Sequence, residues 1–537
     1  MPTIPSIISG SLPHSSGPYP VGYFTIAHAP FPAQGFVLDS PTIDTRAHAN
    51  ARVYGAHDRG TGGWEEGHVP ALGLRRVEYS VWYPCEAPQG WFGRDASPGG
   101  VGWLPSPVSD VLEGYTRFMN DSSWLRAAYP FLRGLGGRLR IPVHPGAKPL
   151  EKITPPSATA SSSPTTSPRT PPLVIFSHGL AGTHLTYSHV CRSLASRGYI
   201  VLSISHQDGS GPYASVPGGA LWGQGGVVRE RQREGALGGD DEGKGVGKIV
   251  RDPSGLQPGS KSAETEDVFK LSYLRHNELD WSPDPQPDVM TLRSLQLDIR
   301  VHELYATYRS FKTLITSSAT SLPAGLRITA DSIHHTSAAA VEWLSGVFPP
   351  GSVATDEVDL VGHSFGGGTM LWALERGVPE GEEALPVRKA VALDPWVDPL
   401  PLPAPVVKTQ KDAPAVPLLA INSSRFTLWS THFTRLKRLV RAANGSLVTL
   451  LGAGHETFSD FPLLWAPTGA SLALIRGIDD LVYAFLKGEL KQCERIRGRE
   501  VDGGVVRTTT MHKGKETGKE RMVGEWGDVV VHELGRD

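Results

Sequence analysis

The sequence predicts an α/β fold with a mainly parallel central sheet and helices on both of its faces. Short apolar runs recur along the 537 residues, for example at 173–177, 199–205 and 358–361, and helix-like stretches separate them. Strands that are apolar throughout are typical of parallel sheets buried on both faces. Their alternation with helices indicates crossover connections, which join parallel neighbours.

The strands follow in order along the chain. Two early strands are expected at 17–28 and 74–83, where aromatic and β-branched residues alternate in part with polar ones. The later strands are apolar and short, as a buried sheet requires. They are expected at 173–177, 199–205, 358–361, 389–393, 416–421 and 447–451.

Three helices are predicted from apolar residues that recur at steps of three and four. The first covers 185–197 and stops at Gly198, and the last covers about 468–487. The longest begins near residue 290. Its apolar stripe consists of Leu297, Val301, Leu304, Tyr308, Phe311 and Ile315.

Residues 1–493 are predicted to form one domain, interrupted by segments that cannot bury a core. Residues 155–172 are almost entirely Pro, Ser and Thr and should form a flexible loop. Residues 208–285 are Gly-rich and charged, which predicts a largely disordered insertion. The charged tail at 494–537 is expected to be disordered as well.

Composition argues against several classes of protein. The chain is 39% hydrophobic and 20% charged, and its formal net charge is -2, so nucleic acid is not an expected partner. Its three cysteines, Cys85, Cys191 and Cys493, suit neither a disulfide framework nor a zinc cluster. Neither a signal peptide nor a membrane-spanning run is recognisable, which makes a cytoplasmic location the expectation. The oligomeric state is left open.

Residues 362–366, Gly-His-Ser-Phe-Gly, match the G-x-S-x-G pattern of a nucleophile elbow. The pattern alone is weak, but here a predicted strand precedes it and a predicted helix follows it. This context indicates the α/β-hydrolase fold and makes Ser364 the expected nucleophile. A plain Gly-rich turn is the alternative.

A serine nucleophile needs a base, and the base needs an acid that orients it. In this fold the order along the chain is serine, acid, histidine. Asp394 directly follows the strand at 389–393 and is preferred as the acid over Asp398, which lies deeper in the loop. His455 follows the strand at 447–451 and is the expected base. The other histidines after Ser364 are less well placed: His432, His512 and His532.

The oxyanion that forms during ester cleavage needs two backbone N–H donors. One is expected from Phe365, the residue after the serine, and the other from Leu180 in the loop after the strand at 173–177. His178 in the same loop is expected to shape it rather than to react. This chemistry requires no cofactor and no metal.

Four motifs in this order resemble the plasma-type platelet-activating factor acetylhydrolases, which are calcium-independent phospholipases A2. They are FSHGLAGT (176–183), GHSFGG (362–367), ALDPW (392–396) and GHETFSDF (454–461). Further similar segments are GPYPVG (17–22), VWYP (81–84), SHQDGSG (205–211) and INSSRF (421–426).

The resemblance implies a serine esterase that hydrolyses the short or oxidised sn-2 acyl ester of a glycerophospholipid through an acyl-enzyme. It places the nucleophile at Ser364, the acid at Asp394, the base at His455 and the oxyanion donors at Leu180 and Phe365. The alternatives are a general carboxylesterase or lipase of the same fold and, in a different class, a non-catalytic binding module.

Residues 122–140 combine apolar side chains near one helical face with several arginines. A basic amphipathic helix can lie at a membrane surface, and in the resembling family this segment contributes to lipid binding. The expectation is therefore peripheral membrane contact here. A lid helix packed on the body of the protein is the equal alternative.

Overall fold

The structure of this chain is a computed structural model that describes most of its residues. The residues outside the description are 1–5, 29–35, 38–41, 45–67, 71, 75, 87–98, 121–128, 130–131, 135, 151–152, 154–169, 218–267, 282–287, 317–325, 331–332, 380, 402–414, 465–467, 498–504, 513 and 535–537.

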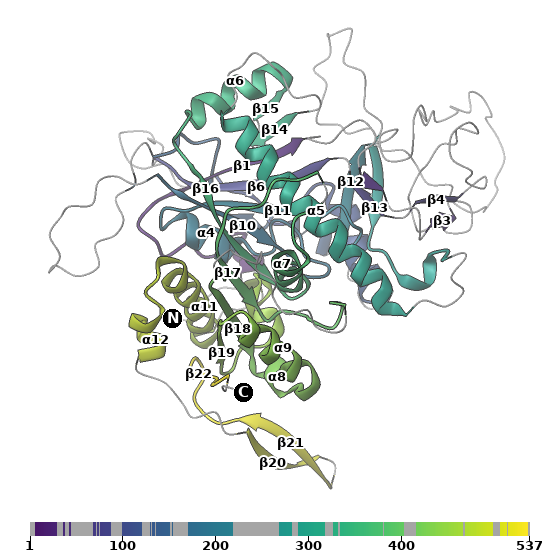
Figure 1. Cartoon of the computed structure of the whole chain (residues 1–537), viewed down its shortest axis with the longest axis vertical. Coiled ribbons are helices and arrows are strands. Elements are labelled where there is room, and N and C mark those ends of the chain that lie inside the picture. The colour runs from purple at the N-terminus through teal and green to yellow at the C-terminus, as the bar shows by residue number, and fades with distance from the viewer. Residues whose placement is uncertain are drawn as a thin grey trace, which may run out of the picture.

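A single large mixed sheet runs through the molecule from top to bottom in Figure 1. Its strands lie in the order β15-β14-β1-β6-β11-β10-β16-β17-β18-β19-β22, and β9 pairs with β1. The six strands from β11 to β19 are all parallel to one another. This arrangement is the mainly parallel sheet of an α/β-hydrolase and confirms the predicted fold class.

The six parallel strands lie where the apolar runs predict them. Their carboxyl ends therefore meet at one edge of the sheet, where the loops carry the predicted site residues. They are β10 (Pro172–Ser177), β11 (Ile200–Ile204), β16 (Ala354–His363), β17 (Val387–Leu393), β18 (Leu418–Ser423) and β19 (Ser446–Leu450).

Antiparallel strands extend the sheet on the side of β11. The early strands β1 and β6 pair along eight residues, from Val21 opposite Pro84 to His28 opposite Val77. The bounds on this side are β1 (Val21–His28), β6 (Val77–Pro84), β9 (His144–Pro145), β14 (Arg327–Ala330) and β15 (Ile333–Thr336).

Helices cover both faces of the sheet and create two apolar cores. Along β10, Leu173 and Ile175 belong to one core, whereas Val174 and Phe176 belong to the other, because side chains alternate along a strand. The first core includes residues of α5 (Val289–Thr316), α6 (Ser337–Val347), α7 (Phe365–Arg376) and α9 (Ser430–Ala442). The second includes residues of α2 (Val108–Phe118), α4 (Ser188–Ala195) and α11 (Gly469–Lys487).

Short elements complete the described part of the chain. The helices are α1 (Ser6–Ser9), α8 (Ser424–Leu428), α10 (Phe461–Leu464) and α12 (Glu494–Arg497), with 3-10 turns η3 (His276–Glu278), η4 (His455–Phe458) and η5 (Leu490–Gln492). The strands are β2 (Phe36–Val37), β3 (Thr42–Asp44), β4 (His68–Pro70), β5 (Gly73–Leu74), β7 (Val101–Gly102) and β8 (Arg140–Ile141).

Residues 208–217 and 268–281 of the insertion predicted at 208–285 are ordered, so its predicted bounds are wrong. Asp208 and Ser210 are fully buried, and β12 (Tyr213–Pro217) pairs antiparallel with β13 (Val268–Ser272). Gly and polar residues suggested disorder here, but hydrogen bonds with distant parts of the chain order this segment. Residues 218–267 lie outside the described residues, as does most of the loop predicted at 155–172.

The tail predicted to be disordered at 494–537 contributes a strand to the central sheet, which corrects that prediction. The strand β22 (Val529–Val531) pairs antiparallel with β19, with Val529 opposite Leu450. A hairpin of β20 (Val505–His512) and β21 (Lys515–Met522) precedes it and projects at the bottom of Figure 1. A three-residue strand in a charged context has too little local pattern to be recognised.

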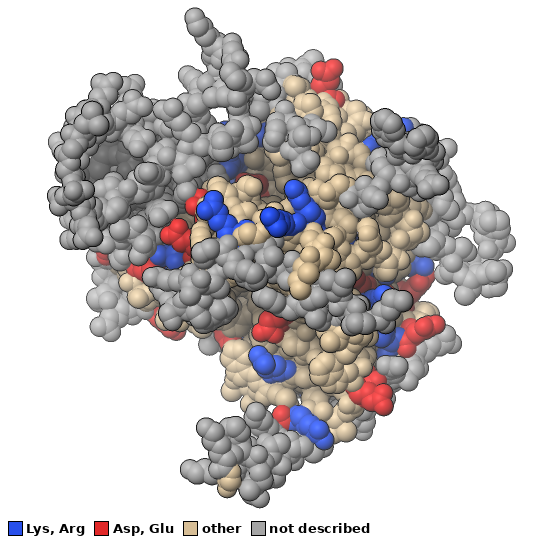
Figure 2. Space-filling view, turned by 180° about the vertical axis from the view of Figure 1, so that it is seen from behind, with Lys and Arg blue, Asp and Glu red and all other residues tan. Residues whose placement is uncertain are grey.

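The described helices include none that is both long enough and apolar enough to cross a membrane. Basic and acidic side chains are interspersed over the described part of the face shown in Figure 2.

Because Val529 of β22 is fully buried in the second core, truncating it should destabilise the protein. We expect Val529→Ala to lower the free energy of unfolding by about 1–3 kcal/mol, measured by chemical denaturation. Val523 is 44% exposed in the same tail, so Val523→Ala should change stability by less than about 0.5 kcal/mol. Equal stability of the two variants would show that β22 does not belong to the folded core.

Candidate active site

Ser364 occupies a strained turn between β16 and α7. Its backbone φ is 54° and its ψ is -118°, a conformation that a non-glycine residue rarely adopts. Three hydrogen bonds fix it there. Its N–H donates to the Leu393 carbonyl at 2.9 Å, and its carbonyl accepts from Gly368 N at 3.0 Å and from Trp396 N at 2.9 Å.

The two glycines of the motif are required by close backbone packing around this turn. A Cβ on Gly362 would lie 2.3 Å from the Gly366 carbonyl oxygen. A Cβ on Gly366 would lie 2.0 Å from the carbonyl oxygen of Ser177 at the end of β10. Both distances are far inside van der Waals contact, so any larger side chain would move the serine.

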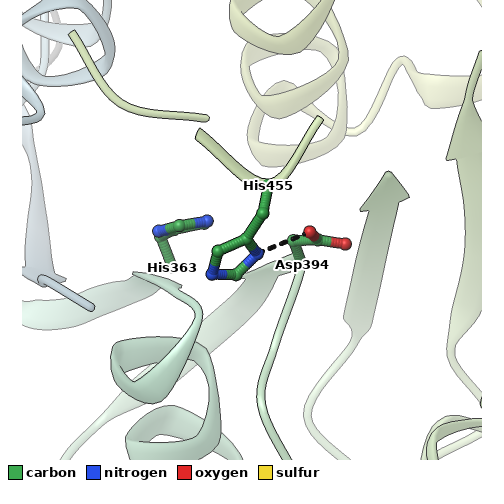
Figure 3. A group of neighbouring side chains, drawn as sticks. All are labelled: His363, Asp394 and His455. Carbon is green, nitrogen blue, oxygen red and sulfur yellow. Dashed lines mark hydrogen bonds and ion pairs between the residues drawn. The ribbon is translucent and has the colours of Figure 1, made fainter. Parts of the chain in front are cut away.

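The structure brings Ser364, His455 and Asp394 together into one hydrogen-bonded relay. His455 Nε2 lies 2.9 Å from Ser364 Oγ, and His455 Nδ1 lies 2.7 Å from Asp394 Oδ2. Figure 3 shows His455 between its neighbours, with its bond to Asp394 dashed. The three side chains come from the loops after β16, β17 and β19. An imidazole held in this way can take a proton from the hydroxyl while the carboxylate stabilises the resulting charge.

Asp394 is fully buried and receives two further hydrogen bonds. Ser423 donates its backbone N–H to Asp394 Oδ1 at 2.7 Å and its hydroxyl to Oδ2 at 2.8 Å. The competitor Asp398 instead accepts from Trp396 Nε1 at 3.0 Å. Asp394, which the sequence favoured over Asp398, is therefore the carboxylate that lies beside His455.

The competing histidines are bonded elsewhere. His432 Nε2 accepts from Val397 N at 3.2 Å, and His532 Nε2 lies 2.7 Å from Thr449 Oγ1. Nothing is described of the His512 side chain.

The His455 ring contacts two other rings. Phe426 stacks on it with centroids 4.4 Å apart and an interplanar angle of 6°. His363 lies on another side at 4.6 Å and bonds through Nδ1 to the Tyr187 hydroxyl at 2.8 Å. Burial and the neighbouring His455 hold the pKa of His363 well below its usual value, so this ring is neutral near pH 7.

The loop expected to supply an oxyanion donor lies directly against the serine. A Cβ on Gly179 would be 3.0 Å from Ser364 Cβ. The backbone N–H groups on either side of Leu180 already have acceptors within the protein. Gly179 N donates to the Tyr187 hydroxyl at 3.2 Å, and Ala181 N donates to the Ser210 carbonyl at 2.8 Å. Phe365 is the first residue of α7, where a backbone N–H has no acceptor within the helix.

His178 is fully buried and bonds through Nδ1 to the Gly179 carbonyl at 2.8 Å. Burial, with a smaller effect of the Arg300 guanidinium, holds the pKa of His178 well below its usual value. A neutral, enclosed imidazole bonded to its own loop fits the predicted shaping role.

The spacing of His363, Asp394 and His455 would also allow a metal ion, because one ligand atom from each lies within 4.8 Å of the others. The hydrogen bonds favour the proton relay. Both ring nitrogens of His455 already bond to Ser364 and Asp394, and His363 Nδ1 bonds to Tyr187.

Comparison with known proteins supports the motifs. The family model described as "Platelet-activating factor acetylhydrolase, isoform II" matches residues 147–216 and 350–478, which include every residue discussed above as a member of the relay or as an expected oxyanion donor. The predicted resemblance to this family is confirmed. A platelet-activating factor acetylhydrolase from Gallus gallus is 24% identical over 54% of this chain and 53% of its own. One from Canis lupus familiaris is 26% identical over 54% and 48%.

The chain thus spans about half the length of the curated relatives it matches. Among solved structures, a ferulic acid esterase from Streptomyces cinnamoneus matches with a TM-score of 0.43 and 14% identity, covering 90% of this chain and 93% of its own.

Sequence reasoning missed the residues that support the relay. Ser423 and Phe426 lie in the INSSRF segment, which was noted for its resemblance without a role. The sequence did offer one signal for Ser423, since it is a polar residue at the carboxyl end of the strand that follows Asp394 in the chain. In the predicted helix at 122–140, residues 122–128, 130–131 and 135 lie outside the described residues. Residues 132–134 are helical, whereas Arg140 begins the strand β8.

We expect Ser423→Ala to slow the reaction of Ser364 with a fluorophosphonate probe by about tenfold. The variant loses one hydrogen bond to a charged carboxylate, worth about 1.5 kcal/mol, and the hydroxyl that accepts from Phe426 N at 3.2 Å. The neighbouring Ser424→Ala variant is the control and should react at the normal rate. If Ser423→Ala also reacts normally, Ser423 does not support the relay.

Proposed function

We propose that this protein is a serine hydrolase that removes a short or oxidised acyl chain from the sn-2 position of glycerophospholipids. The observation that carries the proposal is the relay from Ser364 through His455 to the buried Asp394, with distances of 2.9 and 2.7 Å. The resemblance to platelet-activating factor acetylhydrolases supports the substrate class.

The proposed reaction begins when His455 Nε2 takes the proton from Ser364 Oγ as the oxygen attacks the ester carbonyl. The tetrahedral oxyanion is stabilised by the backbone N–H groups of Leu180 and Phe365. The imidazolium then gives its proton to the departing lyso-lipid, which leaves an acyl-enzyme. A water molecule that His455 deprotonates releases the acid and restores the serine.

The exposures of the acid and the base suit this division of roles. Asp394 is fully buried, whereas the His455 side chain is 27% exposed, so the carboxylate is shielded and the imidazole can be reached by substrate and water. Because backbone amides supply the oxyanion stabilisation, the mechanism requires no calcium. We therefore include calcium independence in the proposal.

Ser364→Ala should abolish labelling by a fluorophosphonate probe and reduce ester hydrolysis by about 10⁴–10⁶-fold, because the covalent step is lost. Active-site labelling and turnover of 2-acetyl-glycerophosphocholine are the measurements. Ser345, exposed on α6, provides the matched control, and Ser345→Ala should behave as the wild type. Labelling that persists in Ser364→Ala would exclude this serine, and an unlabelled wild type would favour a non-catalytic binding module.

Turnover of glycerophosphocholines should fall as the sn-2 chain lengthens from acetyl to a long unmodified acyl chain, and a chelator should leave it unchanged. Initial rates with a series of chain lengths, with and without EDTA, measure both effects. Equal turnover of short and long chains would favour a general lipase of the same fold. Loss of activity with EDTA would contradict the metal-free mechanism.

A further inference from the structure

The long helix α5 buries two faces of opposite character. One carries the predicted apolar stripe, with Leu297, Val301 and Leu304 fully buried. The other face carries polar side chains, spaced three and four residues apart, and these are buried too. Its residues are Arg293, Gln296, Arg300, Glu303, Thr307 and Ser310. A helix on a protein surface normally turns its polar face to water. Here all of these side chains except Thr307 form hydrogen bonds within the protein instead.

Arg300 bonds with the expected oxyanion loop and with the loop after β11. Its Nη1 donates to the His178 carbonyl at 2.6 Å, and its Nη2 donates to Ser210 Oγ at 2.6 Å. Its Nε donates to Asp208 Oδ2 at 2.9 Å, and both charged side chains are fully buried. The guanidinium therefore ties the loop after β10 to the loop after β11.

Asp208 and Ser210 pass this restraint on to the loop that carries Leu180. Asp208 Oδ1 accepts from Ser210 N at 3.0 Å, and the Ser210 carbonyl accepts from Ala181 N at 2.8 Å. The carbonyl of His178 and the N–H of Ala181 are thus both fixed, one on each side of residues 179–180. Since Ala181 has a φ of 54°, the loop needs such restraints to keep its shape.

The same guanidinium contacts the second expected oxyanion donor. Arg300 Cζ lies 4.5 Å from the centroid of the Phe365 ring, within the range of a cation–π contact. Phe365 is fully buried, so the contact is shielded from water. One side chain therefore touches both segments that supply the N–H groups.

We propose that the buried Arg300–Asp208 pair positions the oxyanion hole, a role that rests on the proposed hydrolase function. Arginine suits it because its planar fork holds several acceptors in fixed directions while its face stacks on an aromatic ring, whereas a lysine ammonium has neither a planar fork nor a face to stack. An apolar pair could fill this volume without the cost of burying charge, so retaining the charges is better explained by geometry than by stability.

The test compares Arg300→Lys and Asp208→Asn with the wild type, using 4-nitrophenyl acetate so that lipid specificity plays no part. Rates are divided by the concentration of Ser364 that a fluorophosphonate labels, which removes any misfolded fraction. We expect kcat to fall by about 10²-fold for Arg300→Lys, similar to the loss of one oxyanion donor, with little change in KM. Asp208→Asn keeps its volume and should show a smaller loss in kcat alone.

A second readout is the affinity for a trifluoromethyl ketone, whose adduct with the serine places an oxyanion in the hole. Its inhibition constant should rise in proportion to the fall in kcat/KM. Arg192 on α4 provides the matched control, because it is also fully buried but bonds outside the expected oxyanion loop. It donates to the carbonyls of Ser188 at 3.2 Å and Pro13 at 2.9 Å. Arg192→Lys should lose stability while its kcat and inhibitor affinity per labelled site stay unchanged.

The outcomes separate the two proposals. If the wild type hydrolyses the ester and Arg300→Lys retains its kcat and inhibitor affinity, the positioning role is overturned and the proposed function stands. If Arg192→Lys loses kcat as much as Arg300→Lys, the effect is general destabilisation and the positioning role is again overturned. A wild type that neither hydrolyses the ester nor reacts with the probe would overturn both.

Discussion

The strained backbone at Ser364 is the constraint on which the rest of the site depends. Holding φ at 54° between a strand and a helix lifts the hydroxyl from the edge of the sheet, toward His455. The same turn brings the elbow so close to β10 that only glycine fits at 366, opposite the Ser177 carbonyl. Such strain persists only where the surroundings fix it. Here the surroundings are the backbone groups of Leu393 and Trp396, which also flank Asp394, so the positions of the Ser364 hydroxyl and the Asp394 carboxylate are set together.

Buried polar side chains hold the surrounding loops against the sheet. Five residues after His455 in the chain, the Asp460 carboxylate accepts from the N–H groups of Ser188 and His189 at 3.0 and 2.9 Å and from Trp103 Nε1 at 3.1 Å. It thereby caps α4 while fixing the loop that carries His455. Asp208 and Arg300 act in the same way on the loop after β10. Each loop is anchored by a charge that is bonded from several directions, which is the condition for burying a charge without a large loss of stability.

How much of this architecture the sequence predicts depends on how far apart in the chain the interacting residues lie. The parallel strands and Ser364 could be predicted because apolar runs and the elbow are local patterns, and Asp394 and His455 follow from the order of the loops. The supporting contacts could not be predicted, because Arg300 and Asp208 are 92 residues apart in the chain and no local pattern around either residue indicates that it is buried. Asp208 was even assigned to a disordered insertion, since Gly and charge suggest disorder unless a distant partner is known. β22 was missed for the same reason, because its stability comes from β19 and not from its own three residues.

A second set of the same residue types shows why geometry and exposure, and not residue types alone, define the site. His206 Nε2 lies 2.7 Å from Ser177 Oγ and His206 Nδ1 bonds to Glu303, which gives serine, histidine and acid in the same order as Ser364, His455 and Asp394. All three are fully buried, and burial holds the pKa of His206 well below its usual value while raising that of Glu303. Ser177 ends the regular strand β10, so no turn lifts its hydroxyl toward solvent. This enclosed relay links the end of β10, the loop after β11 and α5, whereas the relay at Ser364 reaches solvent through His455, whose side chain is 27% exposed.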